Sequence, residues 1–260
     1  MPALNVHFLP NHVEPSALAG STVVVIDLLR ASSTICQALA SGATCVVPFL
    51  EIDETRRAAE TFARREIVLG GERHGKVIGG FDLGNSPLEY TPAAVGGRRV
   101  LFTTTNGTRA LHHARLAKRT LIGCAMNRQA VASAVADAAR IDILCAGTDG
   151  AITGEDILAA GAIVYALLDP EVSADSATML HYKTDDGARL AAAQWQELLQ
   201  AARKAGRSPS EQLAEQMCDT PGGSNLLDIG HDADLAACAQ LDALAIVPEL
   251  NRAAGEIRPA

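Results

Sequence analysis

The feature that most constrains the fold is a regular alternation between short β-branched runs and longer stretches rich in Ala and Leu. The run from Val23 to Ile26 is apolar at every position, so both faces of this strand must be buried. Strands that alternate with helices build a parallel sheet covered by helix layers. We therefore predict a three-layer α/β/α fold whose sheet is mostly parallel or mixed.

The elements expected from this pattern occupy the first two thirds of the chain. The expected strands span residues 5–9, 22–27, 44–48, 66–69, 99–103, 120–123 and 142–145. The expected helices span residues 33–40, 51–64, 107–114, 128–138 and 155–168.

The last third differs in character. Residues 173–219 are more polar and helical, and Ser208 followed by Pro209 is typical of a helix start. A final apolar strand is expected over residues 243–247, ending at Pro248. We expect residues 1–260 to form a single α/β domain with this helical excursion, or two subdomains of about 1–170 and 171–260.

Charge and composition exclude several classes of partner. The 22 Lys and Arg residues are outnumbered by 30 Asp and Glu residues, so the formal net charge is -8. Nucleic acid binding needs clustered cationic side chains, and base stacking needs aromatic ones, which are only 3% of the chain. A small anion must then be bound locally, by backbone N–H groups, a few arginines or a metal.

The N-terminus and the cysteines indicate a cytoplasmic protein without a membrane segment. Residues 1–7 lack the basic and apolar pattern of a signal peptide, and no apolar run approaches the length of a membrane span. The six cysteines are scattered and form no C-x-x-C pair. We expect them to be small buried side chains in a reducing compartment.

The first polar cluster follows the most apolar strand. Asp27, Arg30 and three hydroxyl residues, among them Ser33, stand where a helix should begin. Asp27 could bind a metal while Arg30 and the helix N-terminus hold a phosphate. The alternative is a local one, in which Ser32 or Ser33 caps the helix and Arg30 pairs with Asp27. A D-x-D phosphotransferase motif is disfavoured, because Leu29 stands at its second position.

The second cluster is a long stretch over residues 70–87, expected to be a loop without regular structure. Glu72 and Asp82 are oxygen ligands of the kind that Mg²⁺ prefers. Three further side chains there could meet anionic oxygens, namely Arg73, Asn85 and Ser86. The alternative is a flexible, solvated loop.

The third cluster again lies between a strand and a helix. Thr104, Thr105 and Asn106 would gather hydroxyls and an amide at one helix N-terminus, which is a suitable anion cradle. The spacing of a nucleotide P-loop is absent from it, and no G-x-G-x-x-G follows a strand.

Two more segments carry candidate residues. Asp156 stands three positions after Thr153, which is the spacing of a capping box, and a metal role is the alternative. The neighbouring Glu155 is a further candidate metal ligand. Asn127 opens a helix and is expected to cap it.

Taken together, these motifs resemble the 2-phosphosulfolactate phosphatase family. The resemblance rests on residues 27–34, 71–73, 79–87 and 103–108, and it extends through Asn127 and residues 147–161. It implies a cytoplasmic Mg²⁺-dependent phosphatase that removes phosphate from (2R)-2-phospho-3-sulfolactate. In archaea that step belongs to coenzyme M biosynthesis.

The chemistry of this implied substrate suggests roles for the candidates. Mg²⁺ would neutralise the phosphoryl group and orient a water, held by Asp27, Glu72 and Asp82, with Glu155 and Asp156 as further candidates. We expect Asp27, Arg30, Glu72 and Asn106 to be catalytic. We expect the substrate to be bound by Ser33, Arg73, Asn85, Ser86, Thr104, Thr105 and Asn127.

Several alternatives remain open from the sequence. Water could attack the phosphorus directly, or a phospho-Asp27 intermediate could form. The substrate could be another small phosphorylated acid, or the chain could be a non-catalytic anion-binding module. We also expect a homodimer, since symmetric dimers are common.

Overall fold

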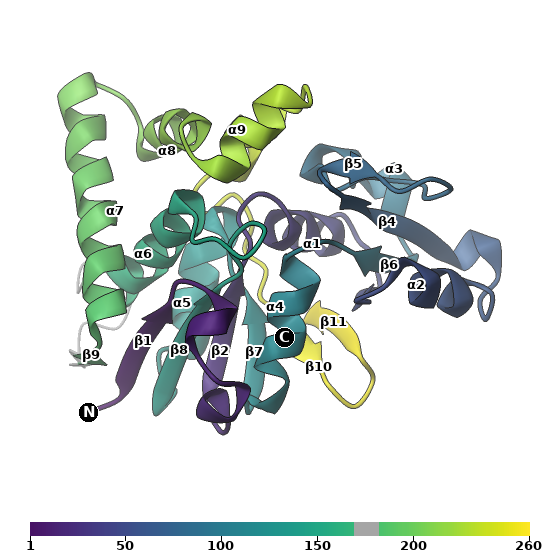
Figure 1. Ribbon diagram of the computed structural model, residues 1–260, viewed down its shortest axis with the longest axis horizontal. Helices are drawn as coiled ribbons and strands as arrows, with labels where there is room; N and C mark the ends of the chain where they lie inside the picture. Colours follow the sequence, from purple (N-terminus) through teal and green to yellow (C-terminus); the bar gives the residue numbers. More distant parts are fainter. Residues whose placement is uncertain (169–181) are drawn as a thin grey trace.

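The computed structural model describes residues 1–168 and 182–260, so part of the helical excursion expected from residue 173 lies outside the described residues. The strands form one 11-stranded mixed sheet in the order β5-β4-β6-β3-β11-β10-β7-β2-β8-β1-β9 (Figure 1). The bounds are β1 Ala3–His7, β2 Thr22–Ile26, β3 Cys45–Pro48, β4 Ile67–Arg73, β5 Lys76–Val77, β6 Arg99–Thr103, β7 Arg119–Ile122, β8 Arg140–Cys145, β9 Lys183–Thr184, β10 Pro248–Asn251 and β11 Glu256–Pro259.

The sheet consists of two parallel groups joined by an antiparallel hairpin. Strands β7, β2, β8 and β1 pair in parallel on one side, and β3, β6 and β4 pair in parallel on the other. The hairpin of β10 and β11 lies between them and pairs antiparallel with both β7 and β3. The prediction of a mostly parallel or mixed sheet is confirmed.

Helices cover both faces of the sheet. In Figure 1, α4 lies in front of the strands and α5 lies behind them. Helix α1 contacts α4, and α5 contacts α6, so each layer packs within itself as well as on the sheet. The bounds are α1 Ala31–Ala40, α2 Ile52–Ala59, α3 Pro92–Val95, α4 Gly107–His113, α5 Arg128–Val135, α6 Gly154–Leu168, α7 Asp186–Ala205, α8 Pro209–Cys218, α9 Pro221–Asp228 and α10 Ala233–Cys238.

Strand β2 is the centre of the core. Its side chains from Val23 to Ile26 are at most 1% exposed, as expected for a strand that is apolar on both faces. It lies between β7 and β8 in register, with Val24 beside Leu121 and Ile143. Because β2 is held on both edges and both faces, the residues that follow it start from a rigid support.

Two expectations about the loops are wrong. The strand expected over residues 243–247 does not form there: β10 begins at Pro248, and β11 follows it. The backbone before Pro248 is instead bonded to another loop, since Leu244 N–H donates to Met126 O and Ile246 O accepts from the Asn127 side chain. Residues 70–87 are not without regular structure either. Strand β4 continues to Arg73 and pairs with β5 in a tight hairpin.

In the described part of the helical excursion, α7 packs on both α6 and strand β1, and α8 also contacts α6. Ser208 caps α8 with its side chain, and Pro209 is the first helical residue, as predicted. Helices α6 and α7 approach closely at Gly161, where an added Cβ would lie 2.1 Å from Ala191 O and 3.1 Å from the Trp195 Cβ. Within the described residues, no helix combines the length and the apolar character that crossing a membrane requires.

Gly161→Ala tests this close approach. The added methyl group must separate α6 from α7, and overpacking of this kind costs about 2 kcal/mol of the free energy of unfolding. Urea denaturation measures that loss. Gly79→Ala, where an added Cβ meets nothing within 4 Å, is the control that should stay near the parent value. A Gly161→Ala protein as stable as the parent would contradict the packing described here.

Candidate functional site

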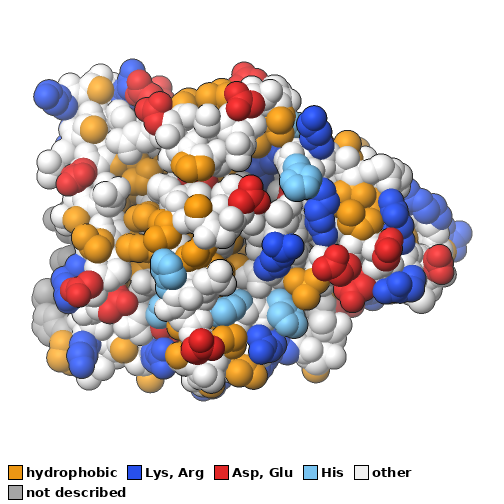
Figure 2. Space-filling model, in the orientation of Figure 1, with side chains coloured by type: hydrophobic (Ala, Val, Ile, Leu, Met, Phe, Trp, Pro, Cys, Tyr) orange, Lys and Arg blue, Asp and Glu red, His pale blue; other side chains and the backbone are white. Residues whose placement is uncertain are grey.

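A cavity of about 370 Å³ opens at the carboxyl ends of β2, β6 and β8. Ligands in open α/β folds bind at this edge of the sheet. Six of the residues predicted from the sequence line it: Asp27, Arg30, Glu72, Asn85, Thr105 and Asn106. On the face seen in Figure 2, Lys, Arg and His side chains gather in the region of β5. The turn between β4 and β5 forms part of the cavity wall.

Asp27 follows β2 and is 7% exposed. Its Oδ1 accepts from Ala31 N–H at 3.2 Å, and its own N–H donates to Ser32 Oγ at 2.9 Å. The pKa of Asp27 is raised to about 7, first by burial and then by the charges of Glu72 and Glu155, against the lowering effect of the Ala31 hydrogen bond. The site therefore places other carboxylates around a carboxyl group that is already poorly solvated.

Gly107 lets two helices begin beside this carboxylate. A Cβ at Gly107 would lie 2.8 Å from Asp27 Oδ2 and 2.5 Å from the Ala31 Cβ. The N-termini of α1 and α4 can therefore approach each other and Asp27 only because residue 107 has no side chain. Their first-turn N–H groups are used inside the protein: Ala31 N–H donates to Asp27 Oδ1, Ser32 N–H to Asp27 O, and Thr108 N–H to Thr104 Oγ1.

Arg30 does not pair with Asp27 through a hydrogen bond, contrary to the local alternative considered from the sequence. Its Nη1 donates to Asp234 Oδ2 at 2.6 Å, and its Nη2 donates to Gly75 O at 3.0 Å. Arg30 itself occupies the N-cap position of α1 without a side-chain capping bond. The serines do not cap α1 either: Ser32 Oγ accepts from Asp27 N–H and donates to Val25 O in β2, and Ser33 Oγ donates to Leu28 O.

Glu72 joins two walls of the cavity. Its Oε1 accepts from Thr105 N–H at 2.8 Å, and its Oε2 accepts from Gly75 N–H at 2.7 Å. The Thr105 hydroxyl lies 3.4 Å from the same Oε2. Glu72 is 6% exposed and lines the cavity. Its carboxylate is anchored by backbone N–H groups from the turn between β4 and β5 and from the loop after β6.

Asp156 and Glu155 lie behind Asp27 at the start of α6. Asp156 accepts from Leu28 N–H at 2.8 Å and from Gly147 N–H at 2.9 Å, so it ties together the loops after β2 and β8. Burial and the charge of Asp27 raise its pKa well above the usual range. Burial also raises the pKa of Glu155, whose Oε2 is buried without a hydrogen-bond partner.

These carboxylates fit a hard divalent cation in donor type, burial and charge. Asp27 and Glu72 line one cavity, and the Glu155 Oε2 is a buried oxygen without a partner. Asp82 lies apart from them: its Oδ2 accepts from Leu69 N–H, and its Oδ1 pairs with Arg64. Across residues 1–168 and 182–260, no three His, Cys, Asp or Glu side chains converge on one point, so the ligand set stays a prediction.

Arg73 and Ser86 use their donors within the protein. Arg73 donates to the carbonyls of Glu72 and Leu50 and to the Thr103 hydroxyl. Ser86 Oγ donates to Asp234 Oδ1 at 2.5 Å. These contacts hold the loops that shape the site. In contrast, Asn85 lines the cavity, and its Oδ1 is buried without a partner.

Three other predicted substrate-binding residues also make internal bonds. The Asn127 side chain accepts from Cys124 N–H and donates to the carbonyls of Ile122 and Ile246, which is consistent with a structural role at the start of α5. Thr104 Oγ1 accepts from Thr108 N–H in the first turn of α4. Ser33 is fully buried. None of these three is among the described residues that line the cavity.

Sequence reasoning missed one wall of the cavity. Helix α9 contributes Asn225 and Asp228, and Ile229 follows its last residue. The turn of the β4–β5 hairpin contributes His74 at a positive φ of 52°. The residues of α9 form no recognisable motif. They reach the site because the fold places the C-terminal helices over the carboxyl ends of the strands, which the sequence does not show.

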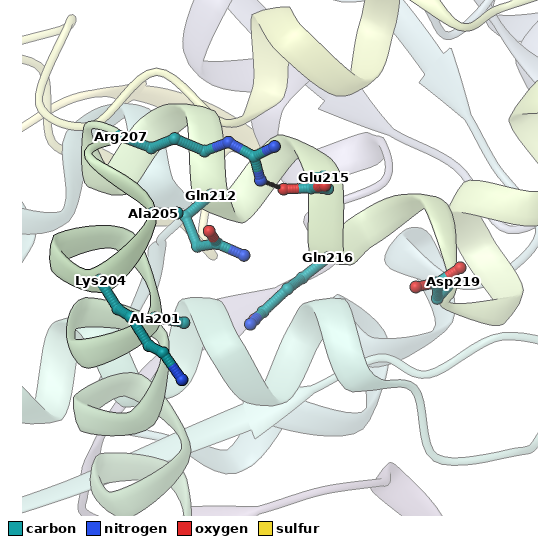
Figure 3. Close-up of a pocket in the computed structure, with 8 residues that line it drawn as sticks. All are labelled: Ala201, Lys204, Ala205, Arg207, Gln212, Glu215, Gln216 and Asp219. Atoms are coloured by element: carbon teal, nitrogen blue, oxygen red, sulfur yellow. Dashed lines mark ion pairs between the residues drawn. The ribbon is translucent and has the colours of Figure 1, made fainter.

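A second hollow lies elsewhere, between α7 and α8 (Figure 3). Its polar lining includes Lys204, Gln212 and an ion pair between Arg207 and Glu215. It contains none of the residues predicted to carry chemistry. The cavity at the strand ends is therefore the candidate active site.

The fold and this cavity define an α/β protein with a buried acidic site at its strand ends. The chain belongs to the 2-phosphosulpholactate phosphatase family, whose model matches residues 7–253. A protein of Symbiobacterium thermophilum named probable 2-phosphosulfolactate phosphatase is 40% identical over 89% of this chain and 91% of its own length. Proteins with the same name from Caldanaerobacter subterraneus and Synechococcus sp. (strain RCC307) are 35% and 37% identical, each covering 92% of the relative.

The pKa of Asp27 predicts how the stability of the metal-free protein depends on pH. Folding raises this pKa from 3.8 to about 7, so the folded state holds the proton more tightly than the unfolded state. The contribution of Asp27 is therefore complete below about pH 4 and is lost as the pH rises through 7. Asp27→Asn should flatten the fall in melting temperature between pH 5 and 8 in EDTA.

The matched control is Asp53→Asn, since Asp53 is an exposed carboxylate on α2. It should keep the pH dependence of the parent protein. If Asp27→Asn also kept that dependence, Asp27 would not be the group whose ionisation opposes folding.

Proposed function

We propose that this protein is a Mg²⁺-dependent phosphatase that hydrolyses 2-phosphosulfolactate to sulfolactate and phosphate. The observation that carries the proposal is that Asp27, Glu72 and Arg30 line the same cavity. Family membership supports the same reaction. An acidic pair beside a guanidinium suits a phosphoryl group bound together with a cation.

The substrate is strongly anionic, because it carries a phosphate, a sulfonate and a carboxylate. Arg30 supplies a guanidinium whose Nη atoms are held from two sides, at Asp234 and at Gly75 O. Asn106, which stands at the N-cap of α4 and lines the same cavity, adds a side-chain amide. These groups would stabilise the equatorial oxygens of the transferring phosphoryl group.

Asp27 and Glu72 would hold Mg²⁺, with the unpartnered Oε2 of Glu155 as a further candidate. The ion would supply charge neutralisation for the phosphoryl group. The chain itself positions these oxygens: α1 and Gly107 fix Asp27, and the N–H groups of Thr105 and Gly75 fix Glu72. Asn85 and Asn106 line the same space and would orient the substrate.

We propose direct attack by water rather than a phospho-Asp27 intermediate. The oxygens of Asp27 are already committed, because on this proposal one of them holds Mg²⁺. Its Oδ1 is also engaged by Ala31 N–H. Acid quenching of a single turnover with radiolabelled phosphate in the substrate should trap no label on the protein, and a labelled acyl phosphate at Asp27 would contradict the proposal. A cytoplasmic location and a homodimer stay predictions.

Phosphate release tests the proposed function. The parent protein should release phosphate from 2-phosphosulfolactate with Mg²⁺ and lose that activity in EDTA. Asp27→Asn and Glu72→Gln should each lower kcat by about 100-fold or more, because each removes an anionic oxygen from the reacting centre.

Glu249→Gln is the control for the loss of a carboxylate, since Glu249 pairs with Arg119 in the sheet. It should retain parental kcat. Turnover of other phosphomonoesters but not of 2-phosphosulfolactate would contradict the substrate. A chain that binds phosphate without any turnover, with affinity unchanged in Asp27→Asn, would be an anion-binding module instead.

A further inference from the structure

Asp234 is a buried carboxylate that contacts the site only through other side chains. It lies on α10, in the C-terminal helical part, and is 1% exposed. Its Oδ2 accepts from Arg30 Nη1 at 2.6 Å, and its Oδ1 accepts from Ser86 Oγ at 2.5 Å. Both oxygens are therefore engaged, and the His231 Nδ1 lies 3.5 Å from Oδ2.

Arg30 is correspondingly constrained. Its side chain is 3% exposed, and it donates to two acceptors from different segments: a carboxylate 204 residues away and the carbonyl of Gly75. A guanidinium is planar, so bonds at Nη1 and Nη2 fix the direction of the whole group. Because Arg30 lines the cavity, those two bonds determine where its charge points.

A stability role alone does not explain this arrangement. Buried ion pairs gain little over well-packed apolar side chains, because both charges lose their hydration. The pair also sits at a junction: Ser86 follows Asn85, which lines the cavity, and Asn85 O accepts from Thr34 on α1. Three segments that shape the cavity thus meet at Asp234.

We propose that Asp234 is the positioning residue of Arg30: it holds the guanidinium in the orientation that binds the phosphoryl group. The proposal rests on the proposed function, since it takes the phosphoryl group to be the anion at Arg30. Asp234 acts through Arg30 and does not touch the substrate.

Asp234→Asn is the direct test, because the amide keeps the size of the side chain and removes its charge. Calorimetric titration with inorganic phosphate, in the presence of Mg²⁺, should show binding weakened by about tenfold or more. The value of kcat/KM for 2-phosphosulfolactate should fall in parallel. Asp142→Asn, which alters another buried, ion-paired carboxylate on β8, should lower the melting temperature without moving either quantity.

A double-mutant cycle separates positioning from a structural effect. In an Arg30→Lys background, where the planar fork is already lost, Asp234→Asn should weaken phosphate binding by less than about twofold. Independent losses that multiply would overturn the proposal. So would an Asp234→Asn protein with parental phosphate affinity, or a parent protein that binds no phosphate.

Two further arms keep the test decisive. If Asp234→Asn fails to unfold cooperatively, Asp234→Glu keeps the charge and should retain phosphate binding within a few fold of the parent, whereas a loss as large as that in Arg30→Lys would contradict the proposal. The proposed function fails separately, when the parent binds phosphate at Arg30 but hydrolyses no phosphomonoester.

Discussion

The burial of several carboxylates at one edge of the sheet is the constraint on which the rest of the structure depends. A carboxylate removed from water must be compensated by hydrogen bonds or by opposite charge. Here backbone N–H groups supply much of that compensation: Ala31 for Asp27, Thr105 and Gly75 for Glu72, and Leu28 and Gly147 for Asp156. The loops after β2, β4, β6 and β8 are therefore held in place by the acidic side chains themselves.

The hydrogen bonds do not compensate fully for the burial of these carboxylates, and the uncompensated groups are the candidates for function. The pKa of Asp27 is raised to about 7 mainly by burial, and Glu155 keeps a buried oxygen without a partner. Structures that retain such groups place them where a cation or a proton is needed. On the proposed function, the cavity balances the unfavourable burial of negative charge against the binding of a divalent ion and an anionic substrate.

The order of apolar and polar residues along the chain was enough to predict the buried strand and the polar residues at the strand ends. The apolar run from Val23 to Ile26 is buried as expected, and six of the predicted residues line one cavity. Sequence could not show which polar side chains are consumed internally, as with Arg73 and Ser86, because their partners come from other segments. It also missed Asp234 and α9, since only the packing of the C-terminal helices brings them to the site.

The most direct test of the central claim, that this cavity is the metal-assisted phosphate site, is a crystal structure of the protein with Mn²⁺ and tungstate. Mn²⁺ replaces Mg²⁺ with a measurable anomalous signal, and tungstate replaces phosphate. The account predicts a Mn²⁺ peak bound by Asp27 and Glu72, with tungstate against Arg30. A metal bound elsewhere, or tungstate outside the cavity, would contradict it.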